Sequence, residues 1–319
     1  VGDRIPPNQG RTNLSDSFIT NGTGPSNDGQ EADACGSSDR GRVRDTNQDQ
    51  FLIARLQKSM LVSSTSLPME DRVFDDNQGE ILLVADGMGG HAAGERASRI
   101  AIGHLVRRLR SGLHWFSQSD DRDESEFVAE LQELLKDAHT RILRESTQDI
   151  ELRGMGTTLT MAHVDWPTMY VVHVGDSRCY LVRDGVAEQL TTDHTVARQM
   201  VESGDMEPEE EQHSRWSNVL WNVLGGRADR ELIVEVRRFE LRRGDTIVLC
   251  SDGLYRYVDA KRLASVIVST ESAEAACQKL IDMANEAGGE DNITVVVSRL
   301  RAGGTDQTTW IDDFDTVLP

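Results

Sequence analysis

Three apolar segments of this sequence end in an aspartate: ILLVAD at Asp86, VVHVGD at Asp176 and TIVLCSD at Asp252. A fourth acid, Asp291 in GGEDN, stands directly before the apolar segment ITVVV. If these segments are strands, each carboxylate lies at the rim of a β-sheet. Four carboxylates at one rim repel one another unless cations bind between them. Because oxygen ligands suit magnesium and manganese, the four aspartates predict a site for hard divalent cations.

Asp-Gly and Gly-Asp pairs also form ordinary turns, and a single pair of this kind indicates only a turn. The segment ADGMGGHAAGE is more informative, because its glycines let the backbone approach a metal closely while the chain turns from strand to helix. The carbonyl group of Gly87 is itself a candidate ligand. A phosphate-cradling glycine loop is disfavoured, because the lysine and the serine or threonine of that motif are missing.

The elements that must position these residues follow from the spacing of apolar side chains, whose period alternates between strand-like and helix-like. The pattern predicts strands over residues 50–56, 81–85, 157–164, 169–174, 179–182, 246–250 and 293–300. It predicts amphipathic helices over residues 92–109, 127–142, 260–268 and 273–287. Tight turns between strands and helices in blocks favour antiparallel pairing and an α+β fold.

Composition limits the class of protein. The 319 residues allow one large domain, and we expect a disordered tail over residues 1–33, a domain over 34–301 and an acidic tail over 302–319. The net charge of −20 argues against nucleic-acid and membrane binding. Four widely spaced cysteines predict neither disulfides nor zinc, and no segment is long and apolar enough to span a membrane. We therefore expect a cytoplasmic monomer.

The ordered motifs of the chain resemble those of the type 2C metal-dependent protein phosphatases, bacterial branch. They are SDRGRVRDTNQD, ADGMGGHAAGE, GMGTTLT, VGDSRCYLVRDG, LTTDHT, SDGL and GGEDNITVV. The resemblance implies two packed antiparallel β-sheets flanked by helices on both sides, a four-layer α-β-β-α sandwich with a metal site at one end. It also implies hydrolysis of phosphoserine and phosphothreonine in proteins by a metal-activated water, with manganese or magnesium as the two bound cations.

The resemblance also implies a role for each matching position. Arg44 would bind the substrate phosphate, and a guanidinium fork suits two phosphate oxygens. Only the motif register selects Arg44 within the basic segment RGRVR. Asp49 would support the metal waters, and Asp176 would belong, with Asp252, to a third and weaker metal site. The ligands of the two main metals would be Asp86, Gly87, Asp252 and Asp291.

Three positions depart from the family pattern. Gln48 stands where many members have glutamate, so the second metal should be held through neutral or water-mediated contacts. Met88 replaces a histidine proposed as general acid in eukaryotic members, which leaves that role to a metal-bound water or His91. Arg256 stands where the family usually has another aspartate. Its charge predicts a weak or absent third metal site and a pairing with Asp176.

Residues 191–226 resemble the variable flap of the family, which either selects substrates or is simply a solvated acidic segment. The histidines, including His163, His173 and His194, show no metal-ligand pairing and are expected to be structural. Expected substrates are phosphorylated proteins, products of a serine/threonine kinase that the enzyme opposes. Two rival functions are a pseudophosphatase that binds phosphoproteins or senses metals, and a two-metal phosphodiesterase acting on nucleotides.

Overall fold

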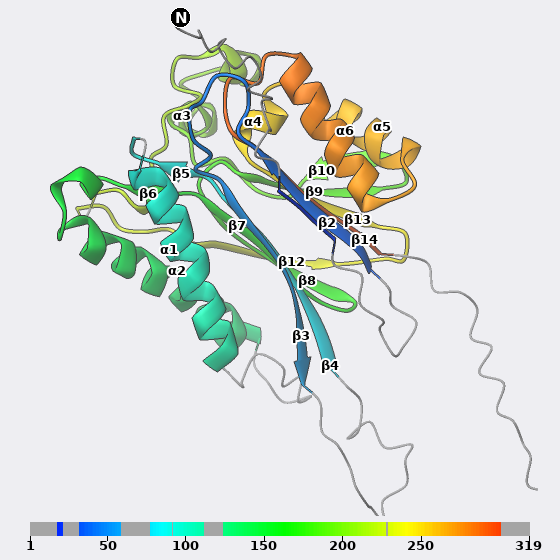
Figure 1. The fold of residues 1–319 in the computed structure, drawn as a ribbon, viewed down its shortest axis with the longest axis horizontal. Helices are drawn as coiled ribbons and strands as arrows, with labels where there is room; N and C mark the ends of the chain where they lie inside the picture. Colours follow the sequence, from blue (N-terminus) through cyan, green and yellow to red (C-terminus); the bar gives the residue numbers. More distant parts are fainter. Residues whose placement is uncertain are drawn as a thin grey trace, which may run out of the picture.

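The computed structural model describes residues 18–21, 32–58, 77–90, 92–111, 124–227 and 229–300. Two antiparallel β-sheets pack face to face, and helices cover the outer side of each sheet (Figure 1). This four-layer α-β-β-α arrangement is the fold that the sequence predicts. No helix in the described part of the chain is long and apolar enough to cross a membrane.

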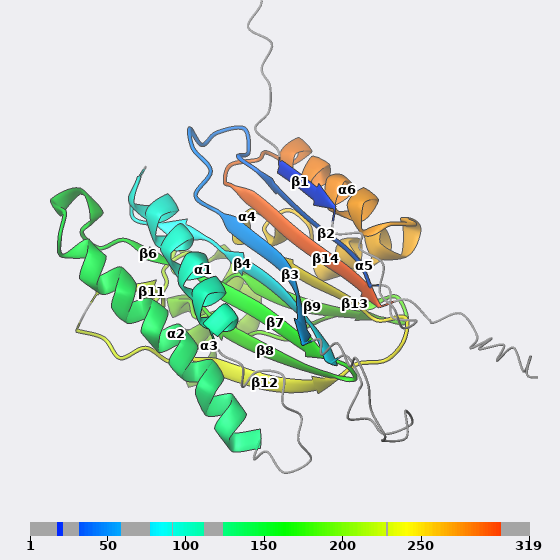
Figure 2. The ribbon, with the colours of Figure 1, turned by 60° about the horizontal axis from the view of Figure 1, so that its bottom comes forward.

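The first sheet has six strands in the order β1-β2-β14-β13-β9-β10. They are β1 (Phe18–Asn21), β2 (Ala32–Asp39), β9 (Arg178–Arg183), β10 (Val186–Gln189), β13 (Thr246–Cys250) and β14 (Ile293–Leu300). Helices α5 (Ala260–Ser269) and α6 (Ala273–Glu286) cover its outer face (Figure 2). Asp259 and Ser272 begin these helices, because each side chain accepts a hydrogen bond from a backbone N–H of the first turn.

The second sheet has five strands in the order β12-β8-β7-β4-β3. They are β3 (Gln50–Lys58), β4 (Asn77–Ala85), β7 (Leu159–Asp165), β8 (Thr168–Val174) and β12 (Glu235–Glu240). Helices α1 (Ala93–Ser111) and α2 (Glu124–Ser146) cover its outer face. The remaining elements are β5 (Gly87–Met88), β6 (Gly156–Thr157), β11 (Leu224–Gly225), α3 (Val196–Ser203), α4 (Asp252–Tyr255), η3 (Ile150–Leu152) and η4 (Pro208–His213).

Successive side chains of β4 point into two different cores. Ile81 and Leu83 pack against α1 and α2, whereas Leu82 and Val84 pack between the sheets. Because both faces of the strand are buried from Ile81 to Ala85, this half of β4 is a continuous apolar run that ends where the strand ends. β13 has the same burial on both faces. The apolar run of β4 is followed by Asp86, and that of β13 is followed, after Ser251, by Asp252.

The structure adds strands that apolar spacing does not predict: β1, β2, β10 and β12. Residues Phe18–Asn21 lie in the segment expected to be disordered, yet they pair with β2. The strand expected over residues 157–164 divides into β6 and β7, because Thr158 leaves the ladder and its hydroxyl accepts a hydrogen bond from the backbone N–H of Asp86. His91 and the tail expected over residues 302–319 lie outside the described residues.

Candidate metal centre

Four aspartates line one cavity of about 420 Å³ at one end of the sandwich. Asp86 follows β4, Asp176 follows β8 after one glycine, Asp252 begins α4 just after β13, and Asp291 stands two residues before β14. In an antiparallel sheet the end of one strand lies beside the start of its neighbour, so β13 and β14 deliver their acids to the same rim. The structure therefore brings together the four acids that the sequence singles out.

Asp49 lies directly behind this cavity, just before β3 begins. Its side chain is buried, and one oxygen, Oδ2, accepts a hydrogen bond from the hydroxyl of Ser251 at 2.7 Å. The other oxygen, Oδ1, is buried and has no hydrogen-bond partner among the described residues. Burial, followed by the nearby charges of Asp252 and Asp291, raises the pKa of Asp49 to about 7. The fifth acid is thus part of the same electrostatic cluster.

The carboxylates of the cavity oppose one another's ionisation. Burial, and then the charges of Asp49 and Asp252, raise the pKa of Asp86 well above its usual value. Burial and the charge of Asp252 raise the pKa of Asp176 to about 8. The Oδ1 atom of Asp252 is also buried without a hydrogen-bond partner in the described part of the chain. Acids held in this way need a cation before all of them can be charged at neutral pH.

Two guanidinium groups neutralise part of this charge. The Nη2 atom of Arg44 lies 2.7 Å from Oδ2 of Asp291, and Arg256 pairs with Asp252. The predicted pairing of Arg256 with Asp176 is therefore wrong. Arg256 directly follows α4, so Asp252 stands one helical turn before it, within reach along the same face.

The residues of the cavity fit two hard divalent cations. Five clustered aspartates outnumber the three described arginines whose charges reach them, Arg44, Arg178 and Arg256, and the donor atoms of the aspartates are all oxygens. The backbone of Gly87 packs closely against that of Gly94. A Cβ atom on Gly87 would lie 2.2 Å from the carbonyl oxygen of Gly94. Only glycine allows the chain to turn there, between β4 and α1.

Gln48 faces the cavity but is tied to the protein. Its side-chain Nε2 donates a hydrogen bond to the carbonyl of Gly90 at 2.8 Å. Its backbone N–H donates to Asn292 Oδ1, and Nδ2 of that asparagine donates to the carbonyls of Arg40 and Thr46, each at 2.9 Å. Asn292 thus holds the whole loop between β2 and β3. Sequence reasoning gave it no role, and its only signal was a place beside Asp291.

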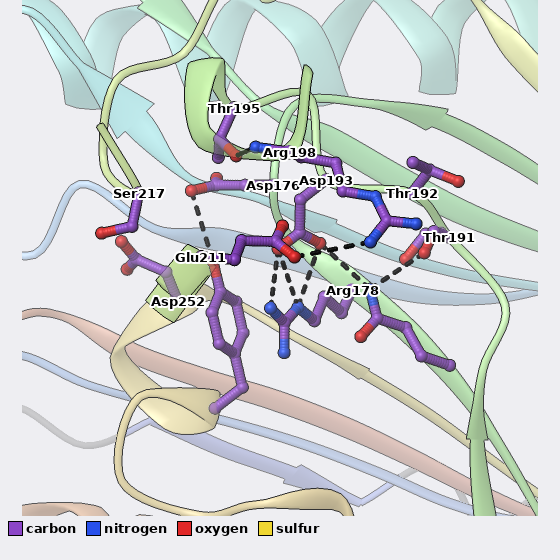
Figure 3. Close-up of polar contacts among 12 residues, drawn as sticks. Asp176, Arg178, Thr191, Thr192, Asp193, Thr195, Arg198, Glu211, Ser217 and Asp252 are labelled. Carbon is purple, nitrogen blue, oxygen red and sulfur yellow. Dashed lines mark hydrogen bonds and ion pairs between the residues drawn. The ribbon is translucent and has the colours of Figure 1, made fainter. Parts of the chain in front are cut away.

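A second set of polar contacts links the flap to Asp176 (Figure 3). Arg178 on β9 forms a two-pronged ion pair with Asp193, with Nη2 to Oδ2 at 2.6 Å and Nε to Oδ1 at 3.0 Å. The guanidinium carbon lies 3.6 Å from the ring centre of Tyr255, whose hydroxyl donates a hydrogen bond to Asp176 at 3.3 Å. The start of the flap is therefore anchored to the cavity by buried side chains that sequence spacing did not reveal.

His173, His194 and Glu235 lie close together, with His194 near the start of the flap. Both ring nitrogens of His173 have partners, the hydroxyl of Thr160 and the carbonyl of Thr192. His194 Nδ1 accepts a hydrogen bond from the backbone N–H of Gly175. Burial lowers the pKa of His173 to about 3 and that of His194 to about 4. Neutral, hydrogen-bonded rings are compatible with the structural role expected from the sequence, whereas their grouping with Glu235 was not expected.

Metal-free protein should lose stability as pH rises from about 6.5 to about 8.5. The folded-state pKa values of Asp49 and Asp176, about 7 and about 8, lie above the ~3.9 of an unfolded aspartate. The folded chain therefore holds protons that the unfolded chain has released, and this stability is lost as pH rises through the folded values. His163 and His173, whose pKa values burial lowers, affect stability only below about 6.5, the pKa of an unfolded histidine.

Thermal melting of the chelated protein across this range checks the prediction. Asp176→Asn should flatten the curve, and added manganese should also reduce the slope, because a bound cation removes the need for protons. A melting temperature of the chelated native protein that is constant across the range would contradict the assignment of buried, protonated aspartates.

The chain is similar to known proteins over most of its length. Residues 62–294 match the family described as Protein phosphatase 2C. A Listeria monocytogenes protein named serine/threonine phosphatase stp is 33% identical over 262 residues, which cover 82% of this chain and 92% of that protein. The crystal structure of the Mycobacterium tuberculosis serine/threonine phosphatase PstP/Ppp has a TM-score of 0.67 and 31% identity, covering 85% of this chain and 99% of that chain. A structure of the catalytic domain of PstP in complex with two manganese ions has a TM-score of 0.64 and 30% identity, with coverage of 85% and 99%.

Proposed function

The chain belongs to the protein phosphatase 2C family, and from this premise we propose how its own residues carry out the activity of that family. It is a metal-dependent protein serine/threonine phosphatase, which hydrolyses phosphoserine and phosphothreonine in proteins and uses two divalent cations, manganese or magnesium. The observation that carries the proposal is the cavity in which Arg44 stands among clustered aspartates.

Asp86, Asp252 and Asp291, with the carbonyl of Gly87, would hold the two cations. Asp86 is placed at the centre, because the charges of the other cavity acids all raise its pKa. When bound, the cations lower the pKa of a water molecule and offset the charge that develops on the phosphoryl oxygens. Asp49 is suited to orient a water molecule, because its buried Oδ1 has no hydrogen-bond partner among the described residues.

Arg44 would bind the phosphate of the substrate. Its side chain is 56% exposed, so it is free to turn from Asp291 toward an incoming phosphate. Two parallel N–H donors of the guanidinium group match two phosphate oxygens, which fixes the orientation of the phosphorus atom. This two-point contact would favour phosphate monoesters as substrates. It would also stabilise the negative charge of the transition state.

No cysteine is needed as a nucleophile. The four cysteines are buried thiols that form no disulfide, and burial raises the pKa of Cys250, which lies beside Ser251, to about 12. A thiol with such a pKa is protonated at neutral pH and is a poor nucleophile. Direct attack by water is therefore the route that the side chains of the site support.

Hydrolysis of a phosphothreonine peptide with manganese, with magnesium and with chelator tests the proposed activity. We expect turnover with either metal, loss of turnover with chelator, and recovery when excess manganese is added. A well-folded protein that binds manganese but does not hydrolyse the peptide would instead support a pseudophosphatase. Gln48 and Arg256 are the two residues that favour this alternative function.

Arg256 should prevent a third cation from binding beside Asp176. Its guanidinium group pairs with Asp252, and its charge lowers the pKa of Asp176, so it occupies the electrostatic position of a cation. Calorimetric titration with manganese should give two sites for the native chain and an additional, weaker site for Arg256→Asp. Arg243→Asp, which makes the same charge change on an exposed turn away from the cavity, should still give two sites. Three sites in the native chain would contradict this role.

The cellular setting is a further part of the proposal. A serine/threonine kinase must supply the phosphorylated proteins, and this phosphatase would oppose it. The four free cysteines support a reducing compartment such as the cytoplasm. The net charge of −20 favours a monomer that does not bind nucleic acid or anionic lipid. Light scattering of the metal-loaded protein tests the monomer.

A further inference from the structure

Three exposed arginines alternate along the loop between β2 and β3: Arg40, Arg42 and Arg44. We call residues Arg40–Arg44 the basic loop; it lies in the blue segment that joins these strands at the upper edge of Figure 2. Arg44 lines the cavity of the metal centre. The proposed hydrolysis uses Arg44 alone, so the other two arginines have no role in it.

Within the described residues, the hydrogen bonds that the guanidinium groups of Arg40 and Arg42 donate go to backbone carbonyl oxygens. Nη1 of Arg40 donates to the carbonyl of Asp45 at 3.3 Å, and Nε of Arg42 donates to the carbonyl of Asn285 at 2.8 Å. Neither forms an ion pair with a carboxylate of the described residues, in a chain with 54 acidic and 34 basic residues. A guanidinium group has five N–H donors, so each arginine keeps donors and its full charge for a ligand.

The backbone of the basic loop is fixed to the segment that carries Asp291. Asn292 donates a hydrogen bond to the carbonyl of Arg40 at 2.9 Å. Gly41 has φ +76°, and a Cβ atom at this position would lie 2.2 Å from the carbonyl oxygen of Asp291. Position 41 therefore requires glycine, and its backbone packs directly against that of Asp291. Two charged groups on a fixed backbone bind an anion with little loss of backbone freedom.

The chain length between the three arginines limits how far apart they lie. An extended chain spans at most about 3.3–3.6 Å per residue, so the Cα atoms of Arg42 and Arg40 lie within about 7 Å and about 14 Å of that of Arg44. With a phosphate at Arg44, the others reach groups within about four residues of it. The flap, which lines the cavity at Asn218 and Leu220, carries the opposite charge in η4 at Glu209 and Glu210.

We propose that Arg40 and Arg42 select phosphoprotein substrates with a second anionic group, an acidic or a phosphorylated residue, within about four residues of the phosphate that is removed. This inference rests on the proposed function. It names the substrate class of the same site. The basic loop would attract such a segment and hold it with the phosphate at Arg44, and the acidic flap would repel it from the other side.

Four phosphothreonine peptides of equal length test the proposal, with glutamate, glutamine, lysine or a second phosphothreonine at the flanking positions. We measure kcat/KM for each peptide with manganese-loaded protein. The native chain should favour the glutamate or the doubly phosphorylated peptide over the glutamine peptide by about five-fold, the size expected for two exposed charge pairs, and added salt should weaken the preference. The double variant Arg40→Gln/Arg42→Gln should reduce the ratio to about one.

The double variant Arg242→Gln/Arg243→Gln is the matched control, because it removes the same charge from an exposed turn at the far end of β13. It should keep the native ratio. A ratio near one for the native chain, or a native ratio in the Arg40→Gln/Arg42→Gln variant, overturns the proposal. Failure to hydrolyse even the glutamine peptide would instead count against the phosphatase activity itself. A higher kcat/KM for only one of the two peptides, the glutamate peptide or the doubly phosphorylated peptide, would support the proposal and identify the preferred anionic group.

Discussion

Replacing Asp86 by asparagine should lower kcat/KM for a phosphothreonine peptide by at least about 10³-fold, because cations in such sites supply several kcal/mol of charge stabilisation. Burial and four surrounding acids raise the pKa of Asp86, which places it at the centre of the negative potential. An amide oxygen has the same shape but no charge, so the variant should also bind manganese more weakly. Peptide hydrolysis and calorimetric titration measure the two effects on one preparation.

Asp282→Asn is the matched control for this prediction, because Asp282 is exposed on α6 and does not line the cavity. It should leave hydrolysis and manganese binding at native values. The chelated Asp86→Asn protein should melt at or above the native temperature, since it loses one buried, repelled carboxyl group. A variant that keeps a tenth or more of native kcat/KM would place the centre of the site elsewhere.

Replacing Arg44 by alanine should lower kcat/KM by about 10²- to 10³-fold, the range seen when one donor to transition-state charge is removed. Lysine should restore part of the loss, because it returns the charge without the two parallel donors. The alanine variant should differ from Asp86→Asn in its affinity for manganese. Arg44 competes with a cation for Asp291, so its removal should leave manganese affinity unchanged or higher.

Hydrolysis and manganese titration of Arg44→Ala, Arg44→Lys and the exposed control Arg243→Ala check this result. Weaker manganese binding by Arg44→Ala would show that the arginine supports the metals and does not compete with them. An unchanged kcat/KM would remove Arg44 from the phosphate site.

The four rim aspartates could be predicted because each terminates or precedes a strand that is buried on both faces. The apolar runs ILLVA in β4 and IVLC in β13 are each followed within two residues by an aspartate, which marks the end of the strand. β2 was missed because its sequence, ADACGSSD, has small and polar residues. It is buried only because β14 pairs with it and Phe51 lies over Gly36, a close fit that exists only in three dimensions.

Side-chain partners were harder to predict than backbone elements. The charge of Arg256 was evident, but its choice of Asp252 depends on the short helix α4, which the sequence pattern did not indicate. Asn292 and Tyr255 act through contacts with residues far away in the sequence. No periodicity encodes such contacts, because they arise when separate loops meet at the end of the sandwich.

The position of β14 has a consequence for the timing of activity during synthesis. This strand is the last of its sheet in sequence but lies between β2 and β13, and it delivers Asp291 to Arg44, which is 247 residues earlier. A nascent chain that ends at β13 has two of the four rim aspartates and no strand to join the two halves of the sheet. Pairing over such a separation forms late in folding. We therefore expect a nascent chain to have no phosphatase activity until translation has passed β14.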